Sequence, residues 1–239
     1  MIKHLTLLLF IGLAWGQAKM DINNLIERGE LLYKPNHEKP YTGRVFDLWS
    51  DGNKKLEGRY RKGLKDGKWI QWRPNGKKEI EFNYKDGEPD GKWINYDYNG
   101  HKKEERTFKD GKQDGLWASW YKNGQKKKEG TYNNGEKHGK WTLWYENGKK
   151  KIEGTYKAGK KDELWTLWYK NGKKKKEGMY KAREKDEIWT LWYKNGRKRI
   201  KGAYKAGEKD EIWTFWYENG KKNKEGTYTA GKKEGAGKV

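Results

Sequence analysis

The chain has 239 residues, of which 32% are hydrophobic, 38% are charged and 15% are aromatic. So few apolar side chains cannot fill a thick globular core, and the composition favours an extended structure held by aromatic contacts. The chain has no cysteine, which excludes disulfides, and its formal net charge of +22 indicates either an anionic partner or a strongly solvated surface.

Residues 1–16 have the pattern of a signal peptide. The apolar run 5–14 is too short to span a bilayer comfortably, and it follows a basic start that contains Lys3. Small residues at Ala14 and Gly16 predict cleavage before Gln17. We therefore expect an exported protein, periplasmic or extracellular in a bacterial envelope, with no transmembrane segment after processing. The alternative is a hydrophobic strand or core helix at the start of the mature chain.

Residues 17–44 lack the pattern of the rest of the chain and are predicted to form an N-terminal cap segment. The stretch 21–33 fits a short helix or strand, and Pro35, Asn36 and Pro40 indicate a turn before the first repeat. A cap of this kind supplies the polar outer face that the terminal unit of a stacked array needs.

From residue 45 to residue 230 the sequence repeats with a constant period, and Val45 takes the first tryptophan position. A fixed period of this kind predicts a repeat architecture, in which neighbouring units bury one another's apolar faces. Each unit has one tryptophan and, three positions later, a second aromatic side chain. The first column is Trp69, Trp93, Trp117, Trp141, Trp165, Trp189 and Trp213, and the second is Trp72, Tyr96, Trp120, Trp144, Trp168, Trp192 and Trp216.

An Asn-Gly pair closes most units, at 75–76, 123–124, 147–148, 171–172, 195–196 and 219–220. This pair predicts a two-residue type I′ turn, in which both residues have positive φ, and therefore a β-hairpin. The turn at 147–148 would pair Tyr145 with Lys150 and Trp141 with Gly154. Each tryptophan of the first column would then lie over a strand glycine of its own hairpin.

Eight such hairpins joined end to end form an antiparallel meander of about sixteen strands. The predicted fold is all-β: an elongated, single-layer antiparallel β-meander of about eight 24-residue hairpin repeats, on the order of 75 Å long. A helix is the rival interpretation for the stretch 173–193, which is rich in lysine and glutamate. Two or more glycines per unit and the Trp-x-Leu-Trp-Tyr runs count against a helix. After the array, residues 231–239 are predicted to be a frayed basic C-terminal tail.

The repeating unit Gly-x-Trp-x-x-Trp-Tyr-x-Asn-Gly-x-Lys-x-x-Glu-Gly-x-Tyr-x-x-Gly resembles the bacterial variant of the MORN repeat, over residues 41 to about 235. The segment 39–43, Lys-Pro-Tyr-Thr-Gly, resembles the entry segment of these proteins. The resemblance implies scaffolding or membrane-proximal contacts, and the bacterial group is often labelled the antitoxin of a toxin–antitoxin system. Glu163, Glu187, Glu211 and Arg183 stand where the pattern has glycine, which predicts local differences in those turns.

A lysine occupies the second position after every hairpin turn, at Lys54, Lys78, Lys102, Lys126, Lys150, Lys174, Lys198 and Lys222. In a meander these turns share one long edge at intervals of about 10 Å, which predicts a positive stripe. One interpretation is a solvated edge that opposes aggregation, partly neutralised by a glutamate three positions further on in most units. The other is a track for an anionic envelope component, such as a polymer, lipid headgroups or an acidic protein. Nucleic acid suits the charge, but an exported protein rarely meets it.

The tryptophans of the second column point to the face opposite the first column. The predicted register sets Trp120, Trp144, Trp168 and Trp192 opposite Lys127, Lys151, Lys175 and Arg199, which predicts cation–π contacts; Trp216 faces Asn223 instead. The column is interpreted as structural, and the alternative is an aromatic contact face for a protein or glycan partner.

Residues suited to catalysis are scarce, since the chain has two serines, Ser50 and Ser119, and after residue 17 only His37, His101 and His138. No triad, metal cluster, cofactor motif or phosphate-binding loop is indicated. We expect a non-catalytic protein that binds or scaffolds an unknown protein or anionic envelope component through its sheet, and peripheral membrane contact is one form of such binding. The alternative function is neutralisation of a toxin, as the family label implies.

Overall fold

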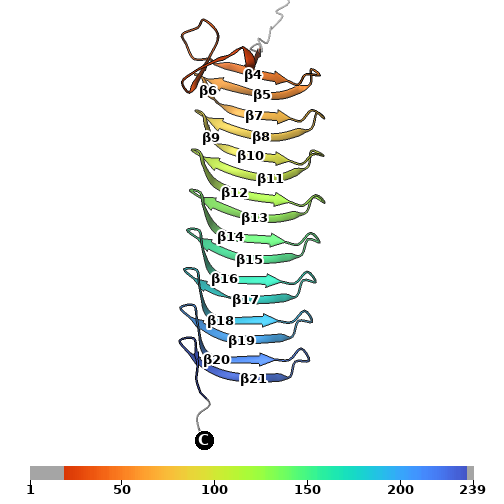
Figure 1. Ribbon diagram of the computed structural model, residues 1–239, viewed down its shortest axis with the longest axis vertical. Helices are drawn as coiled ribbons and strands as arrows, with labels where there is room; N and C mark the ends of the chain where they lie inside the picture. Colours follow the sequence, from red (N-terminus) through yellow and green to blue (C-terminus); the bar gives the residue numbers. More distant parts are fainter. Residues whose placement is uncertain (1–18, 236–239) are drawn as a thin grey trace, which may run out of the picture.

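The computed structural model describes residues 19–235, which form one long stack of antiparallel β-hairpins (Figure 1). The predicted all-β, single-layer meander of eight 24-residue hairpins is confirmed, in a sheet of 20 strands that includes short edge segments. The predicted signal peptide, residues 1–16, lies outside the described residues. The hairpins are β4 (Gly43–Leu48) with β5 (Lys54–Arg61), β7 (Gly67–Trp72) with β8 (Lys78–Lys85), β10 (Gly91–Tyr96) with β11 (Lys102–Lys109), β12 (Lys112–Trp120) with β13 (Lys126–Asn133), β14 (Glu136–Trp144) with β15 (Lys150–Lys157), β16 (Lys160–Trp168) with β17 (Lys174–Lys181), β18 (Glu184–Trp192) with β19 (Lys198–Lys205), and β20 (Glu208–Trp216) with β21 (Lys222–Thr229).

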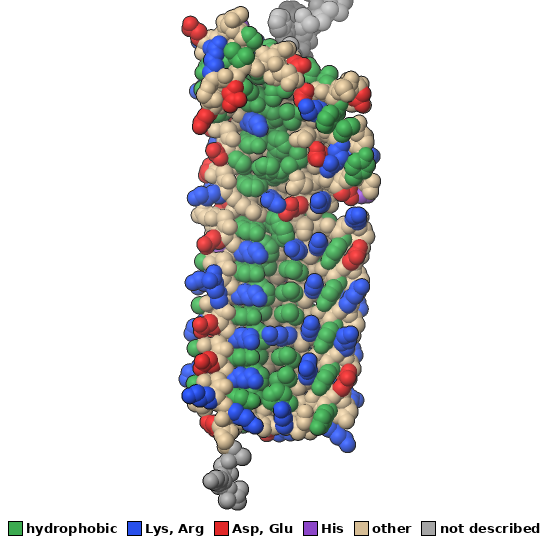
Figure 2. All heavy atoms as spheres, viewed as in Figure 1, with side chains coloured by type: hydrophobic (Ala, Val, Ile, Leu, Met, Phe, Trp, Pro, Cys, Tyr) green, Lys and Arg blue, Asp and Glu red, His purple; other side chains and the backbone are tan. Residues whose placement is uncertain are grey.

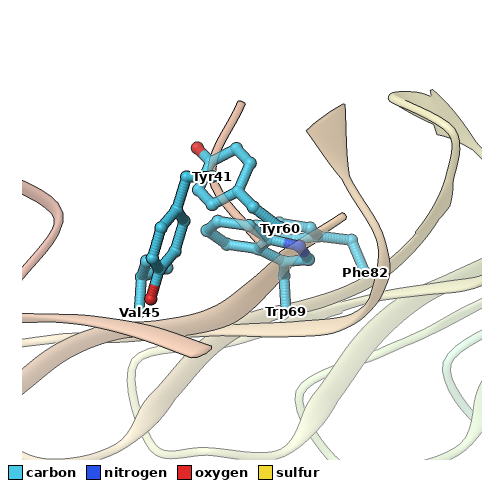
Figure 3. Packing of buried hydrophobic residues seen from close by; sticks show 5 residues of the cluster. All are labelled: Tyr41, Val45, Tyr60, Trp69 and Phe82. Carbon is cyan, nitrogen blue, oxygen red and sulfur yellow. The ribbon is translucent and has the colours of Figure 1, made fainter. Parts of the chain in front are cut away.

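Short elements cover the first hairpin. Strand β1 (Met20–Asp21) pairs in parallel with β4 and is followed by the 3-10 helix η1 (Ile22–Asn24), while β2 (Ile26–Arg28) and β3 (Leu31–Tyr33) form a separate two-stranded sheet. Beneath them Tyr41, Val45, Tyr60, Trp69 and Phe82 form the buried hydrophobic cluster of this end (Figure 3). The N-terminal segment therefore packs on the first repeats and pairs with their edge strand.

The Asn-Gly loops contain three residues, so the predicted two-residue type I′ turn is wrong there. The amide of Tyr145 donates to the carbonyl of Lys149 at 2.8 Å, and the amide of Gly148 donates to the carbonyl of Tyr145 at 2.9 Å. Gly148 has a φ of 77°, whereas Asn147 is not among the residues of positive φ. A turn followed by a left-handed glycine is the usual form of a three-residue hairpin loop.

The longer loop shifts the register by one residue at the loop end of each hairpin. Trp144 lies opposite Lys150, so the predicted pairing of Tyr145 with Lys150 is wrong, while that of Trp141 with Gly154 is confirmed. The asparagine is held by the next hairpin, because its side-chain amide donates to the carbonyl of Lys170 at 3.0 Å. This contact between repeats, which a single hairpin cannot make, favours the observed loop.

Two-residue turns in which both residues have positive φ occur at the other long edge of the sheet. Ala158 and Gly159 have φ values of 45° and 69°, and the equivalent Ala182 and Arg183 have 50° and 87°. The local difference predicted at Arg183 is therefore wrong, as is that at Glu163, Glu187 and Glu211, which keep positive φ values of 55°, 53° and 58°. The amide of Arg183 donates to the carbonyl of Lys161 at 3.0 Å, so the stack holds a non-glycine residue in this conformation.

Three short strands extend the turns of that edge: β6 (Leu64–Lys65), β9 (Glu88–Pro89) and β22 (Lys232–Lys233). Strand β22 falls in the segment predicted to fray, where Lys233 lies opposite Tyr228. Over residues 19–235 the structure contains no helix with the length and apolar character needed to cross a membrane.

Candidate functional site

The sheet has two exposed faces with different chemistry. We call the face that carries the first tryptophan column the aromatic face, and the face that carries Trp144, Thr142 and Glu153 the ion-pair face. Residues directly opposite each other on neighbouring strands share a face, and successive residues alternate between the two.

On the aromatic face most tryptophan rings of the first column lie over a glycine of the preceding hairpin, and Trp93 and Trp117 are the exceptions. A Cβ atom added to Gly154 would collide with the Trp165 ring, and Gly130, Gly178 and Gly202 meet the next tryptophan in the same way. The prediction that the ring covers the glycine of its own hairpin is therefore wrong. The Trp165 Nε1 also donates to the backbone carbonyl of Thr155 at 3.1 Å, so the ring joins adjacent hairpins through packing and a hydrogen bond.

Tyrosine and lysine side chains complete each of these packing units. Trp165 lies edge-on between Tyr156 and Tyr180, at ring-centroid distances of 5.0 and 6.1 Å. The Lys161 ammonium lies 4.5 Å from the Trp165 ring centre and 5.1 Å from that of Tyr180. Lys137, Lys185 and Lys209 each cover a tryptophan and a tyrosine in the same way. We call these four side chains the lysine column.

The lysine column is not neutralised by carboxylates. Over residues 19–235 none of its four ammonium groups lies within ion-pair distance of an acidic side chain. Burial lowers the pKa of Lys137, and the neighbouring Lys128 and Lys161 lower this pKa further. The pKa of Lys176, which lies 4.6 Å from the Trp189 ring centre, is lowered by burial and then by Lys185 and Lys161. These cations repel one another and would be stabilised by a bound anion.

Figure 2 shows this distribution of charge. Lysine and arginine side chains lie over the central hydrophobic columns along the lower half of the face, whereas aspartate and glutamate lie mainly toward the two long edges. On the aromatic face, lysine ammonium groups therefore lie over aromatic rings, and one lysine of the column occupies the same position in each of four successive hairpins.

On the ion-pair face lie the eight lysines that were predicted as a positive edge. Each is the first residue of the second strand of its hairpin. Seven pair with the glutamate three positions further on: Lys54, Lys78, Lys102, Lys126, Lys150, Lys174 and Lys222. Lys198 has Lys201 at that position instead. The pairs favour the structural interpretation of these lysines, and their role in binding stays a prediction.

The second tryptophan column is half-buried and connects adjacent hairpins. The carbonyls of Trp144, Trp168, Trp192 and Trp216 each accept a hydrogen bond of 2.8 Å from a tyrosine hydroxyl of the preceding hairpin. Lys150 lies over Trp168 at 5.8 Å and Lys102 over Trp120 at 6.0 Å, so the cation comes from the preceding hairpin. The predicted pairing of Trp144 with Lys151 is wrong, because the shifted register puts Lys151 over Tyr145 at 5.5 Å.

The ion-pair face also carries exposed aliphatic side chains in the C-terminal hairpins. Leu164, Ile188 and Ile212 are 49, 55 and 57% exposed, and they occupy the same position in three successive hairpins. That position holds Lys68, Lys92 and Lys140 in other hairpins, where the lysine pairs with a glutamate on the adjacent strand. The lysine column and this aliphatic column were not identified from the sequence, although their recurrence once per repeat was the signal that could have revealed them.

The part of the chain that the structure describes contains no cluster suited to metal binding. No three side chains of histidine, aspartate or glutamate within 19–235 come close enough to hold a metal ion. The geometry of both faces suits binding of an extended partner.

The repeat itself matches a known family model. Six segments, 65–86, 89–110, 113–134, 137–158, 164–182 and 212–230, match the MORN repeat variant and together cover just over half of the chain. The chain belongs to the MORN repeat variant family. No curated protein matches the chain. The matched segments include the partly buried Trp93 and Trp117 as well as the buried Trp69 and Trp141. The same repeat therefore accommodates both degrees of burial of the tryptophan.

Proposed function

We propose that this MORN repeat variant protein is an exported, non-catalytic binding or scaffolding protein, and that its aromatic face holds a linear anionic polymer of the cell envelope. The observation that carries the proposal is the lysine column, whose ammonium groups lie on tryptophan and tyrosine rings without carboxylate partners among the described residues. Cations that are fixed on rings and have no carboxylate within ion-pair distance are ready to bind an anion with little rearrangement.

The spacing of the column supports an extended ligand. Two antiparallel strands advance a stack by about 10 Å, so successive lysines of the column stand about 10 Å apart along its axis. A polymer that runs along the axis would meet all four in turn and gain from every repeat, as multivalent binding requires. The signal-peptide pattern of residues 1–16 supports export, and export would give the protein access to envelope polymers.

The test compares two variants with equal loss of charge. In the first, Lys137, Lys161, Lys185 and Lys209 are replaced by glutamine; in the matched control, the ion-paired Lys126, Lys150, Lys174 and Lys222 are replaced. Binding of long-chain polyphosphate and of vesicles with anionic lipid is followed by tryptophan fluorescence, because the column covers the rings. We expect the first variant to lose at least about tenfold in affinity for polyphosphate at low salt, and the control to lose much less.

Salt provides a second readout. Affinity of the wild-type protein for polyphosphate should fall as ionic strength rises, since exposed charges are screened over about 8 Å at physiological ionic strength. Equal losses in the two variants would show that only net charge matters and would overturn the role of the column. Binding of vesicles but not of polyphosphate would assign the face to a membrane surface instead of a polymer.

A further inference from the structure

The last three complete hairpins differ from most of the others on the ion-pair face, and among the earlier ones only that of Leu116 also has an aliphatic residue at the position concerned. In the earlier hairpins Lys68, Lys92 and Lys140 reach the adjacent strand and pair with Glu81, Glu105 and Glu153 at 2.6, 3.4 and 3.2 Å. The equivalent residues of the last three hairpins are Leu164, Ile188 and Ile212, about half exposed. Met179 and Ala203 lie opposite Leu164 and Ile188 on the adjacent strands, and Ile188, Ala203 and Ile212 line one groove. We call it the aliphatic column.

A second change occurs in the same three hairpins. The residue before each aliphatic side chain is Glu163, Glu187 or Glu211, with φ between 53° and 58°, where the earlier hairpins have a glycine. This backbone conformation favours glycine, and a glutamate there reduces the stability of the isolated chain. Two features that weaken the monomer, an exposed aliphatic side chain and a strained glutamate, coincide three times. Such a coincidence indicates a function at this surface.

The two sides of the aliphatic column differ in net charge. A groove on this face is lined by Ile188, Ala203 and Ile212 together with Glu211 and Lys201. Glu211 precedes Ile212 in β20, while Lys201 lies opposite Thr214, two residues beyond Ile212. Within residues 19–235 neither Glu211 nor Lys201 forms an ion pair. Glu163, Glu187 and Glu211 thus border the column on one side. On the other side the Lys174–Glu177 and Lys222–Glu225 ion pairs are neutral, and Lys198 and Lys201, without an acidic partner among the described residues, leave a net positive charge between them.

We propose that the aliphatic column is the contact surface for a second copy of this chain, packed face to face about a two-fold axis parallel to the stack. This operation exchanges the two sides of the column. Glu211 of one copy then meets Lys201 of the other, and Lys201 meets Glu211. A two-fold axis along the strands would set carboxylates against carboxylates, so the charges select parallel stacks.

A second copy also matches the column in spacing and in area. Its hairpins advance by the same distance as those of the first copy, so Leu164, Ile188 and Ile212 each meet their own counterpart without drift. A contact three hairpins long and about 20 Å wide covers about 600 Å² on each copy, and the total of about 1,200 Å² is the lower limit for a specific dimer. A lipid surface fits less well, because anionic headgroups repel the carboxylate row.

The experiment restores the residue that other hairpins carry. In the triple variant Leu164→Lys, Ile188→Lys and Ile212→Lys, the mass in solution is measured by sedimentation or light scattering over a wide range of protein concentration. We expect the wild-type protein to dimerise and the triple variant to remain monomeric with an unchanged circular dichroism spectrum. Leu116→Lys, at the equivalent position outside the column, is the matched control and should dimerise like the wild type. A wild-type protein that stays monomeric at every concentration would overturn the proposal.

Two further variants test the geometry. Glu211→Lys and Lys201→Glu should each weaken the dimer, and the double variant should restore it, because the exchanged charges still meet across the two-fold axis. Ile212→Cys, in a chain without other cysteines, should form a disulfide between its two copies when the stacks are parallel. In antiparallel stacks Ile212 would face Leu164, so cross-linking of Ile212→Cys with Leu164→Cys in place of self-cross-linking would refute the axis.

The result is independent of polymer binding. The aliphatic column and the lysine column lie on opposite faces, so the triple lysine variant should still bind polyphosphate. Loss of polyphosphate binding in that variant, with dimerisation intact, would contradict the assignment of both faces.

Discussion

The tryptophan of the first column has different surroundings in two regions of the stack. One region is the four hairpins that follow Gly130, and the other is the two hairpins that carry Trp93 and Trp117. Trp141, Trp165, Trp189 and Trp213 each lie over a glycine of the preceding hairpin and are only 1–3% exposed. Phe82 and Arg106 occupy the glycine position beneath Trp93 and Trp117, and both of these rings are only partly buried. The residue beneath the ring therefore decides how deeply the tryptophan packs.

Hydrogen bonding differs between the two regions for the same reason. In the C-terminal hairpins, where glycine lies beneath the ring, the indole Nε1 donates to a backbone carbonyl, as Trp189 does to Met179 at 3.0 Å. The Arg106 side chain keeps the Trp117 ring from packing directly on the strand, and the Trp117 Nε1 donates to the Glu104 carboxylate at 2.8 Å instead. The lysine that covers the ring is also absent there, since Pro89 and Gln113 take its place. Glycine, tryptophan and lysine thus act together in each C-terminal hairpin.

Removal of a packed ring should have the largest effect. We expect Trp189→Ala to reduce the free energy of unfolding by about 3 to 5 kcal/mol, the range found for truncation of buried rings. Trp117→Ala should have a smaller effect, because Trp117 is less buried. Urea unfolding followed by circular dichroism measures both. Equal losses would show that glycine does not control the packing.

Filling the space beneath the ring should have the next largest effect. In Gly178→Ala the new methyl group would collide with the Trp189 ring, and we expect a loss of about 1 to 3 kcal/mol, as for overpacked cores. Gly226→Ala is the matched control, because there the nearest atom is the flexible end of Lys233 at 3.2 Å. The comparison fails if the control variant is destabilised as much as Gly178→Ala.

The tyrosine hydroxyls that join hairpins should contribute less. Tyr169→Phe removes the hydrogen bond of 2.8 Å to the carbonyl of Trp192, and we expect a loss of about 1 kcal/mol. Tyr217→Phe lacks such a contact among the described residues and serves as the control. Thermal unfolding of both variants measures the difference. No difference between them would show that the hydroxyl ladder does not stabilise the stack.

The ion-pair face should respond to acid. Burial alone would raise the pKa of Glu81, but hydrogen bonds and charge from Lys68 and Lys78 overcome this and lower the pKa to about 2. Because the folded pKa lies below the unfolded value of 4.5, this carboxylate stabilises the fold above that value, and the stabilisation is lost as pH falls toward about 2. Glu81→Gln should flatten the dependence of stability on pH in this window. An unchanged dependence would contradict the role of the pair.

Exposed lysines should have the smallest effect. Lys174→Gln breaks a 2.6 Å ion pair with Glu177 that is partly exposed to solvent, and we expect the free energy of unfolding to fall by less than about 1 kcal/mol. Chemical denaturation of Lys174→Gln and Trp189→Ala under the same conditions measures the two losses of unfolding free energy. A loss comparable to that of the tryptophan variant would refute the view that the rings, and not the surface ion pairs, hold the stack together.

The sequence by itself determined the repeat, the hairpin and the pairing of Trp141 with Gly154. These follow from local rules: the alternation of side chains along a strand, the turn preference of Asn-Gly and the fixed period of the repeat. The MORN repeat variant family and the all-β single sheet were predicted on this basis and are confirmed.

Only the tertiary structure decided which hairpin each side chain contacts. The Trp165 ring covers Gly154 of the preceding hairpin, and Lys150 covers Trp168 of the next hairpin. Asn147 donates to a carbonyl in the loop of the next hairpin, and this contact favours the three-residue loop over the predicted two-residue turn. A pattern within one repeat cannot specify these contacts, because each side chain has a neighbouring strand on either side. The direction in which it leans depends on the packing of the whole stack.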